Sequence, residues 1–161
     1  MNGASSSTSS SATSVGHDAV YRVYFHGPAY QVLDHAWRAN GDVIGALAGD
    51  LPPDHEPAER VTDFVPRLIE LCFQTAGVWE LGTAGRMALP THVDRVTRYA
   101  GADAPGRLWA VVTPRDGAID AEVVDESGHV RVRLEGYRTI ELPGPLDPDA
   151  LAPIRAAMGD A

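Results

Sequence analysis

The segment that most constrains the fold runs from residue 64 to residue 81, FVPRLIELCFQTAGVWEL, because its apolar residues are too many for one face of a surface helix. Apolar side chains recur at steps of three and four residues and also fill the remaining sides, at Phe64, Leu68, Ile69, Leu71, Cys72, Phe73, Ala76, Val78 and Trp79. Pro66 suits the first turn of a helix, and Gly82 suits its end. The pattern therefore predicts one long, largely buried helix.

Two polar residues interrupt this apolar segment. Glu70 and Gln74 stand four residues apart, so their side chains lie one turn apart on the same face and can meet. A carboxylate among large apolar neighbours needs a partner or becomes neutral, and such a group is suited to acid-base chemistry. The alternative is that Glu70 lies at the edge of the helix and reaches solvent.

Composition and charge exclude several classes of protein. The chain has 161 residues, 44% of them hydrophobic, which indicates one core and a single domain. Its formal net charge is −9 and all 13 basic residues are arginine, which argues against a nucleic-acid partner and a polybasic membrane anchor. The sequence shows neither a signal peptide nor a membrane span. Because the single cysteine, Cys72, cannot form an internal disulfide and no metal-ligand cluster is evident, we expect a cytoplasmic protein without a metal.

The two ends of the chain differ in composition from its middle. Residues 1–18 are mostly Ser, Thr, Ala and Gly and are predicted to be a flexible linker. Residues 144–161 are rich in Pro, Asp and Ala and are predicted to leave the domain as a tail or linker, through a short helix near 150–158. The folded domain is therefore expected to span residues 19–143.

Strands are predicted before the central helix. Residues 20–27, VYRVYFHG, indicate a short extended or turn segment, because Pro28 bars a regular helix across it. Residues 29–38 and 42–48 are predicted to form a hairpin around a turn at 39–41, although the apolar spacing in 29–38 also fits a helix face.

The pattern after the helix is more regular. Residues 82–98 are expected to form a loop followed by a strand. Residues 108–113, 118–124 and 129–142 alternate apolar and polar side chains and are separated by the turns PRDG and DESG, which predicts an antiparallel meander with a possible bulge at Gly136. The fold class predicted is α+β, a curved antiparallel sheet wrapped around one long buried helix.

Four short motifs in this order resemble one known family. They are FHGPAYQ at 25–31, VPRLIELCFQ at 65–74, Leu89-Pro90, and VVDESGHV at 123–130. Together they resemble the C-terminal hotdog half of the double-hotdog dehydratase domain of type I polyketide synthases, over about residues 20–142. The resemblance implies a single hotdog fold for this chain.

The resemblance also implies a reaction, the removal of water from a 3-hydroxyacyl chain held on the phosphopantetheine of an acyl carrier protein, with no cofactor of the chain's own. Glu70 lies where the family has an acidic aspartate, Gln74 is the residue that orients it, and His26 replaces a tyrosine. Residues expected to contact substrate are Tyr30, Gly27, Pro28, Leu89 and Pro90. The family's HxxxGxxxxP motif is absent, so the catalytic base is expected from a first hotdog outside this chain. The partners expected are therefore an acyl carrier protein and a second hotdog, as a homodimer or as that first half.

Other hypotheses remain open. His26 and Glu70 could form an acid-base pair within one hotdog and support dehydration or double-bond isomerisation, or His26 could be a turn histidine bonded to backbone. The chain could be a hotdog that binds or scaffolds an acyl carrier without catalysis, with Arg131, Arg133 and Arg138 facing the acidic carrier. It could also be a thioesterase in which Glu70 directs water.

Overall fold

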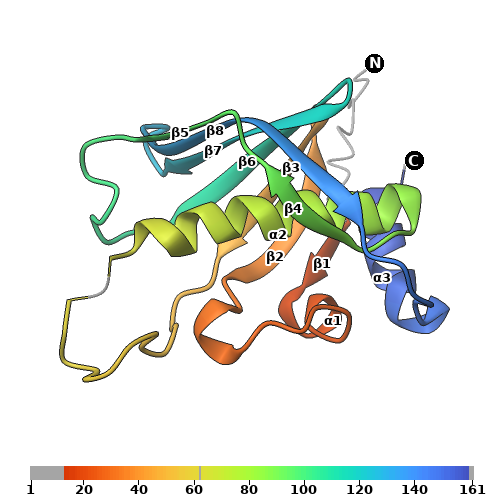
Figure 1. The fold of residues 1–161 in the computed structure, drawn as a ribbon, viewed down its shortest axis with the longest axis horizontal. Helices are drawn as coiled ribbons and strands as arrows, with labels where there is room; N and C mark the ends of the chain where they lie inside the picture. The colour runs from red at the N-terminus through yellow and green to blue at the C-terminus, as the bar shows by residue number, and fades with distance from the viewer. Residues whose placement is uncertain (1–12, 62, 160–161) are drawn as a thin grey trace, which may run out of the picture.

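The described residues of the computed structural model, 13–61 and 63–159, form one curved sheet and a long helix that the sheet wraps around (Figure 1). The eight strands in this part of the chain are β1 Ser14–Gly16, β2 Leu33–Ala39, β3 Asp42–Leu47, β4 Ala88–His92, β5 Arg95–Arg98, β6 Leu108–Arg115, β7 Ala118–Asp125 and β8 Val130–Glu141. The helices are α1 His17–Val20, the 3-10 helix η1 Pro28–Tyr30, α2 Val65–Ala84 and α3 Pro148–Met158. All strand pairs are antiparallel, in the order β1-β2-β3-β6-β7-β8-β4, and β5 also pairs with β8.

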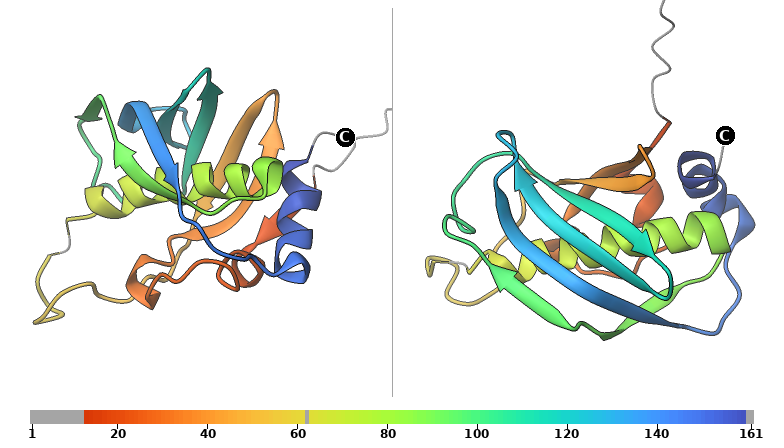
Figure 2. Two further views of the ribbon diagram at one scale, coloured as in Figure 1. Left: turned by 45° about the vertical axis from the view of Figure 1, so that its right-hand side comes forward. Right: turned by 90° about the horizontal axis from the view of Figure 1, so that it is seen from above.

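Helix α2 is the predicted central helix, and the sheet curves around it (Figure 2). Its apolar side chains supply much of the core, with Leu68, Leu71, Val78 and Leu81 fully buried. Burying one such side chain contributes about 1.5–3 kcal/mol to stability, which explains why a helix apolar on most sides belongs in the middle of the fold. The expected α+β arrangement is confirmed.

The predicted end of the helix at Gly82 is wrong. Helix α2 continues to Ala84 and ends at Gly85, which takes the left-handed conformation (φ 66°) common after a last helical turn. A Cβ atom on Gly82 would lie 2.3 Å from the Cβ of Met158, so this glycine allows α3 to pack closely. Gly82 therefore marks the contact between α2 and α3 and not the end of α2.

The hairpin and the meander are confirmed. Strands β2 and β3 are joined at Asn40 and Gly41, which both have positive φ (52° and 87°), as a tight hairpin turn requires. Strands β6, β7 and β8 pair consecutively, and the pairing of β7 with β8 shifts register between Ile119 and Ala121. Opposite this shift, Gly136 has φ 67° and donates its N–H to Asp120 Oδ1 at 3.0 Å, so the predicted bulge is present.

Both ends of the described chain form secondary structure that is part of the folded domain, beyond the predicted limits of 19 and 143. Strand β1 and the start of α1 lie within the segment 1–18 that was predicted to be a flexible linker, whereas residues 1–12 fall outside the described residues. The expected C-terminal helix is present, but the expectation that this tail leaves the domain is wrong, because α3 packs against α2 (Figure 1) and buries Leu151, Ile154 and Met158. Among the described residues, no helix combines the length and the apolarity that crossing a bilayer would need.

Candidate active site

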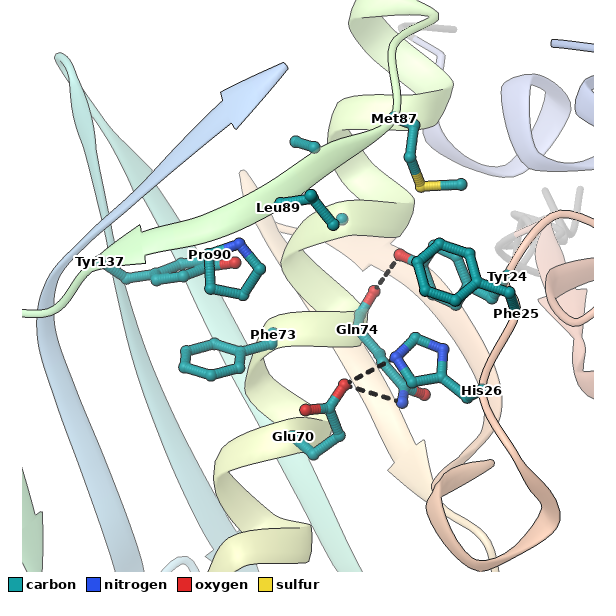
Figure 3. Close-up of a pocket in the computed structure, with 12 residues that line it drawn as sticks. Tyr24, Phe25, His26, Glu70, Phe73, Gln74, Met87, Leu89, Pro90 and Tyr137 are labelled. Carbon is teal, nitrogen blue, oxygen red and sulfur yellow. Dashed lines mark hydrogen bonds and ion pairs between the residues drawn. The ribbon is translucent and has the colours of Figure 1, made fainter. Parts of the chain in front are cut away.

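A pocket of about 160 Å³ opens beside the middle of α2, between β4, β8 and the segment that precedes η1 (Figure 3). It is lined by Tyr24, Phe25, His26, Glu70, Phe73, Gln74, Gly77, Met87, Ala88, Leu89, Pro90 and Tyr137. Most of these side chains are apolar or aromatic, and three polar ones, His26, Glu70 and Gln74, converge on one wall. This is the usual composition of a site for a small, largely apolar ligand.

Two ionisable side chains meet on that wall. His26 Nε2 lies 3.0 Å from Glu70 Oε1, and the two side chains are 27% and 23% exposed. His26 comes from the loop before η1, whereas Glu70 stands on the second turn of α2, so the contact joins distant parts of the chain. Because both groups are partly exposed and both line the pocket, a bound molecule can reach them. The polar partner of the His26 ring within the described residues is thus Glu70 and not the backbone.

Gln74 is a second polar partner of Glu70. The Gln74 side chain is buried, and its Nε2 donates to Glu70 Oε1 at 3.0 Å and to the carbonyl of Tyr30 at 2.8 Å. The hydroxyl of Tyr21 accepts the N–H of Leu33 at 2.9 Å and donates its own proton to Gln74 Oε1. That donation identifies Oε1 as the acceptor end of the amide and leaves the NH₂ end facing Glu70.

His26 is held by aromatic packing as well as by Glu70. Its ring lies edge-on to Tyr24, with centroids 5.3 Å apart, and is stacked on Phe25 at 5.8 Å. The Nδ1 atom is buried and has no hydrogen-bond partner within residues 13–61 and 63–159. An unpaired buried nitrogen costs about 1–3 kcal/mol, so it is a departure from ordinary packing that active sites tend to retain. The two aromatic rings and Glu70 together therefore set the orientation of the His26 ring.

The phenols near the site remain protonated. Burial raises the pKa of Tyr21 and that of Tyr24, and the nearby Glu70 carboxylate raises both pKa values further. Tyr24 accordingly donates its hydroxyl proton to the backbone carbonyl of Gln74 at 2.9 Å. Both tyrosines act as neutral hydrogen-bond donors that stabilise the Gln74 turn of α2.

The pocket includes some of the predicted substrate contacts and not others. Leu89 and Pro90 line it, on the strand β4 that covers α2 (Figure 3). Tyr30 points elsewhere and donates its hydroxyl to Asp54 Oδ2 at 3.3 Å, while Gly27 and Pro28 form the turn after His26 without lining the pocket. The substrate-binding roles of these five residues stay predictions.

Several pocket residues were missed by sequence reasoning. They are Tyr24, Phe25, Phe73, Met87 and Tyr137, together with Tyr21 behind the pocket. The aromatic residues in 20–27 could have indicated this part of the pocket, because a turn on the surface needs only polar residues. Tyr137 gave no signal, because strand alternation alone does not place it in the pocket.

Two other sequence hypotheses concerned metals and an acidic carrier. In the described part of the chain, no three histidine, cysteine, aspartate or glutamate side chains come together as metal ligands would. The arginines of the last strand are neutralised by carboxylates, in the pairs Arg131 with Asp125 at 2.8 Å, Arg133 with Glu122 at 2.6 Å and Arg138 with Asp94 at 3.1 Å. This row therefore offers a carrier protein little uncompensated positive charge.

Comparison with solved structures identifies the fold. The chain is similar to the dehydratase domain from the CurF module of the curacin polyketide synthase, with TM-score 0.61 and 22% identity over 80% of this chain and 48% of that one. It is also similar to a trans-AT polyketide synthase dehydratase domain from Brevibacillus brevis, with TM-score 0.63 and 21% identity over 81% and 49% of the two chains. These likenesses confirm the α+β hotdog fold. The chain spans about half the length of the solved domains.

Sequence comparison points the same way. The chain is 32% identical over 95 residues to a polyunsaturated fatty acid synthase protein of Thraustochytrium sp. (strain ATCC 26185 / S-3), a match that covers 55% of this chain and 3% of that protein. The profile of the PS-DH family, the polyketide synthase dehydratase N-terminal domain, matches residues 2–148.

That match corrects one expectation from the sequence. The assignment to the C-terminal hotdog half is wrong, because the matching profile is that of the N-terminal domain. Hotdogs share one layout of strands around a helix, so short motifs in the right order do not distinguish one half from the other. The expectation of a base from a missing first hotdog loses its basis as well. With residues 2–148 matched, the chain belongs to the polyketide synthase dehydratase family, as a hotdog domain of the N-terminal type.

Proposed function

We propose that this hotdog removes water from 3-hydroxyacyl thioesters carried on an acyl carrier protein, with His26 and Glu70 as its acid-base pair. The observation that carries the proposal is the 3.0 Å contact between His26 Nε2 and Glu70 Oε1 at the wall of an apolar pocket. Membership of the dehydratase family supports the choice of reaction. The two groups that the reaction needs, one base and one acid, thus come from a single chain.

The proposed roles follow from the order of proton transfers. The reactive state in this proposal is the one in which the proton shared across the 3.0 Å contact lies on the Glu70 carboxyl, so that His26 Nε2 is free to accept a proton. When substrate binds, the Glu70 carboxyl donates its hydrogen bond to the β-hydroxyl instead of to His26. The Nε2 lone pair is then free to accept the α-proton. The Cα–H electrons form the Cα=Cβ bond, the Cβ–O bond breaks, and the oxygen leaves as water with the Glu70 proton.

The same contact restores the pair after turnover. The reaction leaves a protonated His26 beside an ionised Glu70, which attract one another across 3.0 Å. Return of the proton from Nε2 to the carboxyl regenerates the starting state without any outside donor. Gln74 supports this cycle because its N–H keeps Glu70 Oε1 in place in both protonation states.

The pocket and the partners fit the same proposal. Phe73, Met87, Leu89 and Pro90 offer an apolar wall for the acyl chain, and the phosphopantetheine arm of a carrier protein would deliver the thioester to its mouth. Pairing with a second hotdog is expected from the solved dehydratase domains, which are about twice as long as this chain. In this proposal the partner supplies structure and no catalytic group.

The test is incubation of the purified chain with a 3-hydroxybutyryl thioester, followed by mass spectrometry for the loss of one water. We expect turnover by the unaltered chain and its loss in His26→Ala. His129→Ala is the matched control, because that histidine is 78% exposed and lies outside the pocket. Hydrolysis of the thioester would favour the thioesterase hypothesis, and binding without any reaction would favour a scaffold role.

A further inference from the structure

A further polar group, the hydroxyl of Tyr137, reaches the pocket from the wall opposite His26. Strict alternation along β8 buries Val132 and Leu134 and would next point Gly136 inward and Tyr137 outward. The bulge at Gly136 adds one residue to the strand, so that Tyr137 faces inward and is 2% exposed. Bulges often re-aim a side chain next to an active site. Here the bulge places a phenol in the candidate site.

The ring of Tyr137 is held firmly. It stacks on Phe73 of α2 with centroids 4.6 Å apart and an angle of 23° between the rings. Figure 3 shows the ring extending from β8 behind Pro90, with its hydroxyl directed toward the pocket. A substrate would therefore meet a preorganised hydroxyl, which needs no rearrangement to donate.

The hydroxyl of Tyr137 differs from those of the other tyrosines near the site. Tyr21, Tyr24 and Tyr30 each donate to a protein acceptor, whereas the Tyr137 hydroxyl has no hydrogen-bond partner among the described residues. The Tyr137 oxygen is not among the buried polar atoms that lack a partner in the described residues, so a ligand can reach this hydroxyl. A phenol that lines a pocket and lacks a protein acceptor is suited to donate to a ligand.

The charge around Tyr137 keeps it a donor. Burial raises its pKa well above the usual value, and the carboxylates of Glu80 and Glu70 raise that pKa further. The phenol therefore stays neutral and protonated throughout the physiological range of pH. It can donate one hydrogen bond to an acceptor oxygen in the pocket.

We propose that Tyr137 Oη donates a hydrogen bond to the thioester carbonyl of the bound acyl chain and stabilises the enolate formed when the α-hydrogen is removed. The inference rests on the proposed function and adds a catalytic residue to it. In the step concerned, the Cα–H bond breaks, the proton goes to His26 and the electron pair moves onto the carbonyl oxygen. The electrons then return to form the Cα=Cβ bond as the β-oxygen leaves with the Glu70 proton. Tyr137 donates throughout and is not consumed.

The experiment separates enolate formation from the loss of water. A butyryl thioester has α-hydrogens but no β-hydroxyl, so exchange of those hydrogens in D₂O reports on the base and the oxyanion donor alone. Tyr137→Phe keeps the stack on Phe73 and removes only the hydroxyl. Removing one oxyanion donor costs about 10²–10³-fold in rate, and we expect that fall in both exchange and kcat with KM little changed. Tyr99→Phe, outside the pocket, should leave both rates as they are.

Infrared spectra give a readout besides activity. The carbonyl stretch of a ¹³C-labelled butyryl thioester should shift to lower frequency when bound to the unaltered chain and should lose that shift in Tyr137→Phe. Rates and carbonyl frequency unchanged in Tyr137→Phe, with exchange abolished in His26→Ala, would overturn the role of Tyr137 and leave the proposed function standing. A lack of both exchange and dehydration in the unaltered chain would overturn the two together.

Discussion

Two glutamates on the same helix have different surroundings. Glu70 is half-buried at the pocket and faces His26, with Gln74 as its other partner. Glu80 is 3% exposed and accepts hydrogen bonds at one oxygen from Arg86 at 2.9 Å and Thr139 at 2.8 Å. The two differ in partner rather than in residue type. A histidine can exchange a proton with a carboxyl, whereas an arginine keeps its own, so Glu70 is suited to chemistry and Glu80 to structure.

Replacing Glu70, the proposed acid, should have the largest effect. Glu70→Gln keeps the shape of the side chain and removes its transferable proton, so we expect kcat for dehydration to fall about 10²–10⁴-fold, the usual contribution of a positioned acid or base. The fold should remain, because Glu70 is partly exposed and Gln can still bond to His26. Steady-state kinetics measure the loss of kcat, and urea denaturation checks that the fold remains. Full activity in this variant would remove Glu70 from the mechanism.

Removing the hydrogen bond from Gln74 to Glu70 should have the next largest effect. Gln74→Leu leaves the hydroxyl of Tyr21 and the carbonyl of Tyr30 without their partner and frees Glu70 to move. A displacement of about 1 Å in a catalytic group can cost on the order of 10²-fold, and we expect a loss of kcat of up to this size. The unpaired groups should also lower the free energy of unfolding by about 1–3 kcal/mol. Activity equal to that of the unaltered chain would show that Glu70 needs no such support.

Replacing Glu80 should lower stability and leave activity unchanged, the reverse of the result expected for Glu70. Glu80→Gln retains an acceptor for Arg86 and Thr139 but loses the charge, so we expect a loss of about 1.5–3 kcal/mol in the free energy of unfolding. The kcat should stay unchanged, because Glu80 does not line the pocket. Chemical denaturation and kinetics on the same preparation decide the matter. A large loss of kcat with normal stability would contradict the division between the two glutamates.

A third carboxylate, in a turn, shows the smallest effect expected. Asp125 accepts the N–H groups of Ser127 and His129, both at 2.9 Å, and contacts Arg131 at 2.8 Å. The backbone bond from His129, with help from Arg131 and Ser127, lowers the pKa of Asp125 to about 2. The unfolded value is about 3.9, so the stabilisation is full above about pH 4 and is lost as pH falls toward 2.

Urea midpoints of the unaltered chain and Asp125→Asn measure this contribution. The difference between the two proteins should be constant near neutral pH and shrink as the pH falls through the range from about 4 to about 2. A difference that does not change with pH would mean that the Asp125 carboxylate is not the stabilising form.

The sequence predicted those parts of the fold that depend on local pattern. Apolar periodicity identified α2 and the strands β6, β7 and β8, and Asn40-Gly41 matches the hairpin turn. Other features depend on contacts between distant segments. The role of Gly82 depends on the approach of α3, and the half of the family to which the chain belongs is not encoded in a layout that hotdogs share.

The part of the site that depends on local pattern was also predictable from the sequence. Glu70 and Gln74 stand four residues apart on one helix, so their contact follows from helix geometry. The position of His26 beside Glu70 requires the loop before η1 to fold against α2, which local pattern does not specify. Gly136 was recognised as a possible bulge, but its consequence for Tyr137 appears only when the strand is paired.

A double-mutant cycle on His26 and Glu70 tests the central claim most directly. Residues that act as one catalytic unit are strongly non-additive, so dehydration by the double variant His26→Ala, Glu70→Gln should be no slower than by the slower single variant. The measurement is the rate of water loss from a 3-hydroxybutyryl thioester for all four proteins. Losses that multiply in the double variant, or single variants as fast as the unaltered chain, would contradict a shared proton between these two side chains.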